Sequence, residues 1–330
     1  EAFKRIKEES DKEVTFKKEN SDGIITATGK KWKRILRKQN WTVSAAGTVF
    51  HQDFDGVIPS ILTTWFDERK QYKKKMYEAD QAGNDVDREY FDNMQYIKKI
   101  QLNAMYGACG NRFFKFFDVR LAESTTLSGR EVLYHMASKI AEELDGVYNM
   151  DSECIIYGDT DSVYFKTYQN DADSALATAN EVCDAINASY PDFMAESFLC
   201  NDSHNSLMKA EQEIVSDRGI YIKKKYYILH LVYNDGAPVD KMKYMGVPIK
   251  KTTLPPEIKD KLSSFIERLL KGESWDIIGP EIVDFKDALY ELNDITLLGS
   301  PTGVKSVETN TEIYNAKGEE RKRIAGHCRA

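Results

Sequence analysis

Two carboxylates separated by one residue mark the segment of this chain that is best suited to chemistry. Residues 157–164 read Tyr-Gly-Asp-Thr-Asp-Ser-Val-Tyr, and apolar residues precede and follow the acidic pair. This pattern predicts a tight β-hairpin, with Gly158 breaking the two apolar runs and with Asp159 and Asp161 at the tip. Two ionised carboxylates repel each other, and a cation between them relieves the repulsion. Paired Mg²⁺ ions roughly 3.5–4 Å apart, held by carboxylates, drive in-line phosphoryl transfer.

The same octet has a plainer interpretation, which its residues leave open. Asp and Ser also favour ordinary polar turns, because their side chains hydrogen-bond to the nearby backbone. A calcium-binding loop of the EF-hand type is disfavoured, because its Gly and its distal Glu are not at the required offsets.

Cationic and amide side chains recur at helical spacing upstream of the octet. Lys99, Asn103 and Tyr106 are related as i, i+4 and i+7 and therefore share a helix face, and Arg69 and Lys73 are related as i and i+4. Arg and Lys are donors only, and Arg grips phosphate with two hydrogen bonds. These side chains suit a triphosphate, although solvated helices often carry the same spacing.

The elements that must position these side chains are two helices, predicted over residues 57–79 and 86–107. A short connection at residues 80–87, with Gly83-Asn84, joins them. Adjacent helices with a short link should pack antiparallel, so both could direct donors at one site.

Three consecutive lysines, Lys223–Lys225, precede Tyr226 in a run that is predicted as a strand over residues 220–233. Lys is depleted in strands, and strand alternation would place Lys223 and Lys225 on one face. The lysines indicate either an edge strand protected against aggregation or a surface that holds a nucleic-acid backbone.

The rest of the chain mixes both kinds of secondary structure and predicts an α/β (α+β) fold. The predicted elements are a strand within 43–50, a helix over 120–146, a hairpin over 153–166, a helix over 171–189 ended near Pro191, a turn at 234–236, a strand continuation at 244–249, helices over 256–271 and 280–293, and a loop-like last thirty residues.

Length and composition describe a soluble globular protein of two or three domains, with 330 residues and 42% hydrophobic residues. No apolar run approaches the ~20 residues of a membrane span. The five scattered cysteines contain no Cys-x-x-Cys pair, which fits free thiols in a reducing cytoplasm. The net charge of −7 argues weakly against a nucleic-acid partner, but basic clusters at 30–38, 69–75 and 223–225 can still bind phosphates locally.

Several motifs, in order, resemble those of family B DNA polymerases, most of all the T-even-type bacteriophage branch. Residues 99–107 resemble the fingers motif Lys-x₃-Asn-x₂-Tyr-Gly, residues 157–162 resemble the palm motif with the metal-binding aspartates, and residues 223–226 resemble the Lys-Lys-Arg/Lys-Tyr motif. Residues 55–59, followed by Arg69 and Lys73, resemble the entry to the fingers. Met245-Gly246 and the tail from Gly299-Ser300-Pro301 to Cys328-Arg329 are similar to the phage branch.

The resemblance implies a right-hand fold with helical-hairpin fingers at 55–118, an antiparallel palm sheet with packed helices at 119–254 and a partial helical thumb at 255–330, after a palm-side segment at 1–54. It implies a DNA-directed DNA polymerase that uses two Mg²⁺ ions, a deoxynucleoside triphosphate and primer–template DNA in the cytoplasm of a bacterial host. An N-terminal polymerase chain and a sliding clamp are further expected partners.

The resemblance also assigns roles to individual residues. Asp159 and Asp161 would be the metal ligands, and Lys99 would also protonate the departing pyrophosphate. Tyr106 would back the nascent base pair, and Glu211 or Glu213 would be an accessory acid. The nucleotide-binding residues would be Arg69, Lys73, Lys99, Asn103 and Tyr106, and the DNA-binding residues Lys223, Lys224, Lys225 and Tyr226.

One family motif, Asp-x-x-Ser-Leu-Tyr-Pro-Ser with its essential metal-binding Asp, is not found in its expected form. Residues 53–60 keep its Asp, Pro and Ser, but Gly56 and Ile58 replace its Ser and Tyr, and the segment lies only sixteen residues before Arg69. We therefore expect residue 1 to lie just downstream of the true motif, the exonuclease domain to be absent and the thumb to be cut at Ala330. The chain would be a fragment or a split C-terminal subunit that cannot synthesise DNA alone.

Two other functions stay open at this point. A reverse transcriptase or RNA-dependent RNA polymerase also carries a carboxylate hairpin in its palm, although the helix motif at 99–106 disfavours it. A non-catalytic DNA-binding remnant of a polymerase would keep the basic segments without metal-dependent nucleotide binding.

Overall fold

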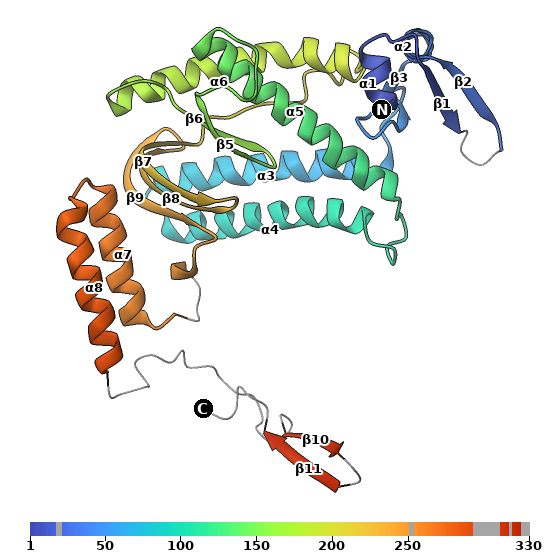
Figure 1. Cartoon of the computed structure of the whole chain (residues 1–330). Helices are drawn as coiled ribbons and strands as arrows, with labels where there is room; N and C mark the ends of the chain where they lie inside the picture. The colour runs from blue at the N-terminus through green and yellow to red at the C-terminus, as the bar shows by residue number, and fades with distance from the viewer. Residues whose placement is uncertain (18–21, 251–253, 293–310, 317–318, 325–330) are drawn as a thin grey trace. The chain divides into compact units, whose positions relative to one another are not determined.

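The computed structural model describes residues 1–17, 22–250, 254–292, 311–316 and 319–324, whose course is drawn in Figure 1. The chain divides into two compact units, Glu1–Gln212 and Glu213–Ala330. This division falls inside the segment 119–254 that was expected as the palm, and the predicted domain limits stay predictions.

The first unit opens with small elements whose buried side chains belong to its main apolar core. These are α1 (Ala2–Lys7), the antiparallel pair β1 (Glu13–Lys17) and β2 (Ile24–Thr28), α2 (Gly29–Lys38), and the pair β3 (Trp41–Val43) and β4 (Val49–His51). The single strand predicted within 43–50 is wrong. Gly47 adopts φ +87°, and its N–H donates to the carbonyl of Ser44 at 2.8 Å, so the segment turns back on itself as a hairpin.

Two long antiparallel helices follow and confirm the predicted helical pair. α3 (Val57–Gln81) and α4 (Asp85–Cys109) lie side by side in Figure 1 and are longer than predicted. The Asn84 side chain accepts the N–H of Asp87 at 3.2 Å and so caps α4, which fixes the reversal of the chain within three residues.

α5 (Val119–Asp145), the hairpin of β5 (Ile155–Asp159) and β6 (Ser162–Phe165), and α6 (Ala172–Ser197) complete the described elements of this unit. The prediction that α6 ends near Pro191 is wrong, because the helix continues to Ser197. Proline removes one helical hydrogen bond, but Tyr190 and Ser197 are buried on either side of it and hold the turn in the core.

One apolar core joins these helices to the hairpin. Cys154, which directly precedes β5, is fully buried in it, and Val163 and Phe165 of β6 pack against it. Other members come from α5 and α6, including Val132, Ile140, Ala141, Val182, Ile186 and Tyr190. The base of the carboxylate hairpin is therefore part of the main core of the unit.

The second unit contains a three-stranded antiparallel sheet of β7 (Ile214–Lys223), β8 (Tyr226–Asn234) and β9 (Ala237–Met245). The single strand predicted over 220–233 is wrong, because the chain reverses at Lys224 and Lys225. The turn predicted at 234–236 is confirmed, with positive φ at Asp235 and Gly236.

A short 3-10 turn η1 (Pro248–Lys250), α7 (Pro256–Leu270) and α8 (Trp275–Glu291) follow the sheet. The predicted start of α8 at residue 280 is wrong, because the Ser274 side chain accepts the N–H of Asp276 at 3.2 Å and caps the helix earlier, with Pro280 inside it.

The final residues are not wholly loop-like, because β10 (Thr311–Ala316) and β11 (Glu319–Ile324) pair as an antiparallel hairpin. The tail residues Gly299-Ser300-Pro301 and Cys328-Arg329 lie outside the described residues.

Helices mixed with small antiparallel sheets confirm the α+β class. Four cysteines, Cys109, Cys154, Cys183 and Cys200, are free thiols, as expected. None of the helices in the described ranges combines the length and hydrophobicity that a membrane crossing requires.

Candidate functional site

The tip of the β5–β6 hairpin presents the two candidate metal ligands. Asp159 ends β5 opposite Ser162, and Thr160 and Asp161 form a two-residue turn between them. Gly158, which was expected to break the two apolar runs, pairs with Val163 within the strands. Asp161 is exposed and Asp159 is half-buried.

Local hydrogen bonds shape this turn. The N–H of Asp161 donates to the Asp159 carbonyl at 2.6 Å, and the Ser162 hydroxyl donates to the same carbonyl at 3.2 Å. Thr160 adopts φ +55°, which is a strained conformation for a β-branched residue. Such strain persists only where the surroundings hold it, and it concentrates at functional sites.

This donor set fits a hard divalent cation, because carboxylate oxygens are the ligands that Mg²⁺ prefers. Asp159 and Asp161 supply only part of a coordination sphere. Across the described ranges, no group of three or more His, Cys, Asp or Glu side chains is arranged to hold a metal ion.

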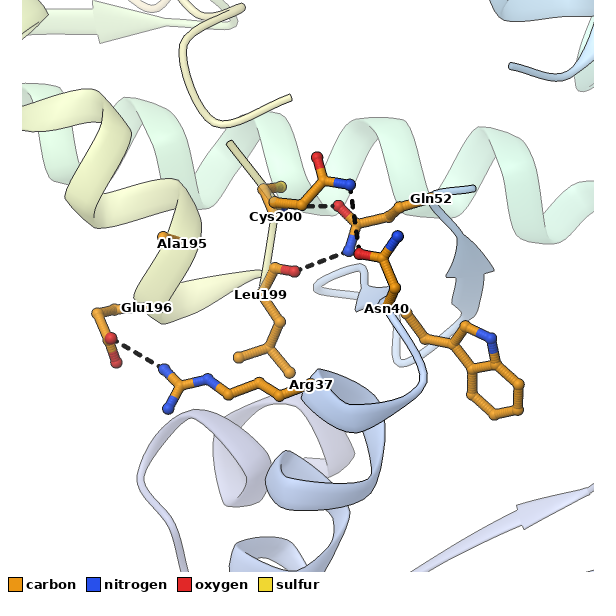
Figure 2. A pocket seen from close by; sticks show the side chains of 9 residues that line it. Arg37, Asn40, Gln52, Ala195, Glu196, Leu199 and Cys200 are labelled. Carbon is orange, nitrogen blue, oxygen red and sulfur yellow. Dashed lines mark hydrogen bonds and ion pairs between the residues drawn. The ribbon is translucent and has the colours of Figure 1, made fainter. Parts of the chain in front are cut away.

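Asp53, which the sequence offers as an apparent third aspartate, is engaged elsewhere. Its Oδ1 accepts a hydrogen bond from Asn40 Nδ2 at 2.8 Å. Figure 2 shows the neighbouring pocket of about 200 Å³, where Asn40, Gln52 and Asn201 hydrogen-bond to one another or to the Leu199 carbonyl. This amide network fastens the β3–β4 hairpin to the segment after α6.

The antiparallel helices bring two of the candidate phosphate ligands, Arg69 and Lys99, to nearly the same level. Lys98 Nζ on α4 contacts Glu68 Oε2 on α3 at 2.6 Å, so the next residues, Lys99 and Arg69, lie beside this ion pair. Arg69 is half-buried, and its Nε is buried without a hydrogen-bond partner, whereas Lys99 is exposed.

Lys73 and Asn103 extend this set in opposite directions. Lys73 lies one helical turn after Arg69 on α3, and Asn103 lies one helical turn after Lys99 on α4. Because the two helices are antiparallel, Lys73 and Asn103 lie at opposite ends of a row of donors. From the Glu68–Lys98 level, the row spans about 15 Å at about 1.5 Å of rise per residue. Long cationic side chains can bring such a row onto one extended anion.

Tyr106 ends the row and connects it to the next helix. Its hydroxyl lies 2.6 Å from the Thr126 hydroxyl on α5, and 45% of the residue is exposed. α5 also contacts both strands of the carboxylate hairpin. One helix therefore contacts both Tyr106 and the strands of the carboxylate hairpin within the first unit.

The lysine motif lies in the second unit, where it forms the β7–β8 turn. Lys223 pairs with Tyr226, and Lys225 adopts φ +62°. A Cβ on Gly246, which itself has φ +66°, would lie only 2.1 Å from the Lys225 carbonyl oxygen. Gly246 thus lets the turn close, and the turn displays its lysines on a projecting loop instead of on alternate faces of a strand.

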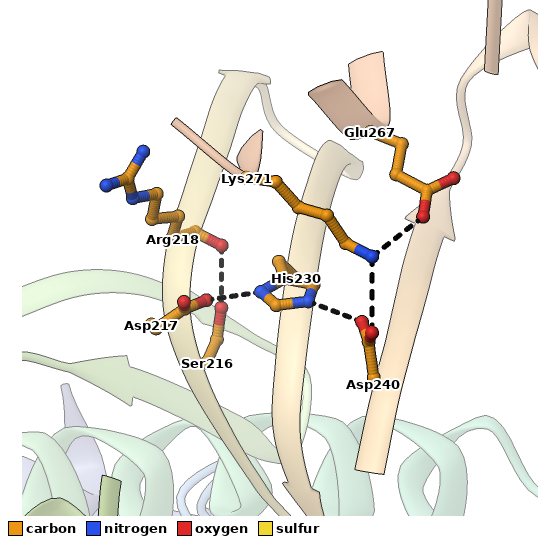
Figure 3. Close-up of polar contacts among 7 residues, drawn as sticks. All are labelled: Ser216, Asp217, Arg218, His230, Asp240, Glu267 and Lys271. Carbon is orange, nitrogen blue, oxygen red and sulfur yellow. Dashed lines mark hydrogen bonds and ion pairs between the residues drawn. The ribbon is translucent and has the colours of Figure 1, made fainter. Parts of the chain in front are cut away.

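A charged network braces the sheet behind this turn (Figure 3). His230 on β8 lies 2.7 Å from Asp217 on β7 and 2.8 Å from Asp240 on β9, and Lys271 links Asp240 to Glu267 of α7. Burial alone would lower the pKa of His230, but its hydrogen bonds to the two aspartates outweigh burial and raise it.

Sequence reasoning missed an aromatic and basic loop between α4 and α5. Phe113 is 83% exposed and Phe116 is 52% exposed, with Arg112 lying 4.9 Å from the Phe113 ring centroid and Lys115 lying 5.9 Å from that of Phe116. Exposed aromatic rings with nearby cations suit stacking on nucleic-acid bases. The signal was the run Phe-Phe-Lys-Phe-Phe at residues 113–117, shortly after the helix end at Gly110.

Comparison with known proteins indicates the family to which the chain belongs. Residues 6–295 match the model of "DNA polymerase family B". The chain is 24% identical over 302 residues to the DNA-directed DNA polymerase of Escherichia phage RB69. This alignment covers 70% of this chain and 33% of the phage protein. It is 27% identical over 247 residues to the DNA polymerase alpha catalytic subunit of Mus musculus, covering 74% and 15% of the two chains.

The archaeal DNA polymerase of Thermococcus gorgonarius is also similar, at 27% identity over 226 residues, covering 68% of this chain and 25% of that protein. The chain thus spans about a third or less of the length of these relatives. Because the family match extends over most of its residues, the chain belongs to DNA polymerase family B.

Proposed function

We propose that this chain carries the nucleotide-binding and metal-binding part of a template-directed DNA polymerase, which transfers a nucleotide from a deoxynucleoside triphosphate to a primer 3′-hydroxyl. The observation that carries the proposal is a strained turn with two carboxylates and a cationic helix pair, both supported by α5, in a member of family B. Right-hand architecture follows from the family, with α3 and α4 as fingers and the β5–β6 hairpin in the palm.

Asp159 and Asp161 would hold two Mg²⁺ ions, with the exposed Asp161 as the more direct ligand. When bound, the ions lower the pKa of the primer hydroxyl and stabilise charge on the pyrophosphate. The remaining ligands would include a carboxylate from outside the turn, and Glu211 or Glu213 would be an accessory acid. Both glutamates are exposed, so exposure does not choose between them.

The donor row would bind the triphosphate along its length. Lys73 and Arg69 lie toward one end, where the terminal phosphates would sit, and Asn103 lies toward the other. Lys99, in the middle, would give a proton to the departing pyrophosphate. Tyr106, anchored to Thr126, would back the base pair, and Lys223–Tyr226 would hold the DNA near the primer end.

A nucleotide-binding assay with chemistry blocked tests this proposal. The purified chain is mixed with a primer–template whose primer ends in a dideoxynucleotide, with Mg²⁺, and each deoxynucleoside triphosphate is titrated in. The nucleotide complementary to the template base should bind at least tenfold more tightly than the others. Each charge-assisted contact contributes about 1.5–3 kcal/mol, so Lys99→Met should weaken binding about tenfold to a hundredfold.

Lys98→Met is the matched control, because Lys98 is the neighbouring lysine on the same helix but contacts Glu68. It should lower helix stability while leaving nucleotide affinity within about threefold. DNA binding without template-dependent nucleotide selection would refute the polymerase proposal and favour a non-catalytic DNA-binding module. A preference for ribonucleotides would favour another palm-type polymerase.

The same preparation tests whether the chain acts alone. With an extendable primer we expect no incorporation, because the turn supplies only two carboxylates. If the chain alone incorporates nucleotides, and if Asp161→Ala and Asp53→Asn each abolish this incorporation, the expectation is contradicted and Asp53 is a metal ligand.

A further inference from the structure

A single carboxylate at the end of α5 connects both ends of the β5–β6 hairpin. Asp145 Oδ2 accepts hydrogen bonds from the Ser152 hydroxyl and from the Cys154 N–H, the latter at 3.3 Å. Its Oδ1 accepts the Tyr168 hydroxyl at 3.1 Å. Ser152 and Cys154 precede β5, and Tyr168 follows β6.

The position of Asp145 is itself fixed. It is the last residue of α5, and the following Gly146 ends the helix with φ +72°. Leu144 packs against the apolar core that contains Cys154. The hydrogen bonds to Ser152, Cys154 and Tyr168 also hold the pKa of Asp145 below its usual value, as expected for an ionised acceptor.

The contacts of Asp145 hold the base of the hairpin, so a small rotation at the base would displace the acidic tip. Asp159 lies five residues beyond Cys154, or about 17 Å along an extended strand. A rotation of about 10° at the base would therefore move the tip by about 3 Å, more than a metal or nucleotide site tolerates. Ile156 lies at a register shift in the ladder, which already bends the strand between base and tip.

We propose that Asp145 is a positioning residue, whose carboxylate fastens both ends of the β5–β6 hairpin to α5 and so fixes the place of Asp159 and Asp161. This inference rests on the proposed function of these two aspartates. It assigns no contact with substrate to Asp145.

Three substitutions separate the positioning role of Asp145 from the effect of its charge. Asp145→Asn keeps an oxygen that can accept from Ser152 and Cys154, and its amide can donate to the Tyr168 hydroxyl. Asp145→Ala removes all three contacts. Tyr168→Phe, at a residue that is 57% exposed, removes one contact with little risk to folding.

The test measures amide hydrogen exchange of residues 154–166 and the affinity of the full chain for Mn²⁺ by electron paramagnetic resonance. Asp145→Ala should raise hairpin exchange at least tenfold, leave α6 exchange unchanged and weaken Mn²⁺ binding at least fivefold. Asp145→Asn should restore both within about twofold, and Tyr168→Phe should raise hairpin exchange about threefold.

The inference would be overturned if the hairpin exchanged at the wild-type rate in both Asp145→Ala and Tyr168→Phe. It would also be overturned if Asp145→Asn showed the same faster exchange and weaker Mn²⁺ binding as Asp145→Ala. If Asp145→Ala does not fold, Tyr168→Phe alone decides. Asp161→Asn separates the two proposals. Unchanged Mn²⁺ affinity in that variant contradicts the metal site itself, whereas the exchange measurement still reports on Asp145.

Discussion

A buried histidine in α5 makes the first unit sensitive to mild acid. His135 is 8% exposed, stacks on Phe193 at 3.9 Å between ring centroids, and contacts Tyr148 and Ser189 through its two ring nitrogens. The Ser189 hydroxyl donates to the Ile186 carbonyl, so it must accept from Nε2. Tyr148 then donates to Nδ1, which keeps the ring neutral.

Burial, reinforced by Lys7 and Lys139, lowers the pKa of His135 to about 4. The unfolded chain takes up this proton below its usual pKa of 6.5, but the folded unit does not until the pH approaches 4. Stability is therefore fully present above pH 6.5 and is lost as the pH falls. At about 1.4 kcal/mol per pH unit, lowering the pH from 7 to 5 removes about 2 kcal/mol.

Native-state hydrogen exchange of α5 and α6 peptides, corrected for intrinsic rates, measures this loss. His135→Gln should lose about 2 kcal/mol less than the wild type between pH 7 and 5. Tyr148→Phe should show an intermediate loss, because the neutral ring loses its donor and its pKa rises. Parallel pH profiles for the wild type and His135→Gln would refute the reasoning.

Two further outcomes concern the second unit. Gly246→Ala should destabilise the β7–β8 turn by about 3 kcal/mol and weaken primer–template binding. Gly236, with φ +75°, has open space around it, so Gly236→Ala should destabilise its turn by only about 1 kcal/mol. Equal losses of exchange protection in the two variants would contradict the close contact between Gly246 and Lys225. His230 has a raised pKa, so its contribution is fully present below pH 6.5 and is lost as the pH rises through the raised value. After correction for intrinsic exchange rates, protection of the β7–β9 amides should therefore rise between pH 8 and 6 in the wild type but not in His230→Gln, and identical corrected profiles would rule this out.

Local periodicity and turn chemistry predicted α3 to α6 and the acidic hairpin of the first unit, but not its elements before residue 57. The helices α3 and α4 and the acidic hairpin follow from apolar spacing and from residues that favour turns, which act over a few positions. The helix end predicted near Pro191 and the helix start predicted at residue 280 were both wrong, because packing against buried neighbours outweighs the loss of one helical hydrogen bond at an internal proline.

The lysine turn shows what local reasoning cannot reach. Lys224-Lys225 lacks the Gly, Asn or Asp that usually marks a hairpin turn, and the space it needs comes from Gly246, which follows β9 and lies far from the turn in sequence. Likewise, the support of both Tyr106 and the acidic hairpin by α5 depends on tertiary packing between residues far apart in the sequence.

The central claim is that the acidic tip and the cationic helix pair act on one nucleotide. Its most direct test is the affinity of the complementary deoxynucleoside triphosphate in the blocked complex, measured with and without Mg²⁺. In the wild type Mg²⁺ should raise affinity at least tenfold, Asp161→Asn should abolish that gain, and Lys99→Met should weaken binding under both conditions. A full Mg²⁺ gain in Asp161→Asn, or unchanged binding in Lys99→Met, would contradict the account.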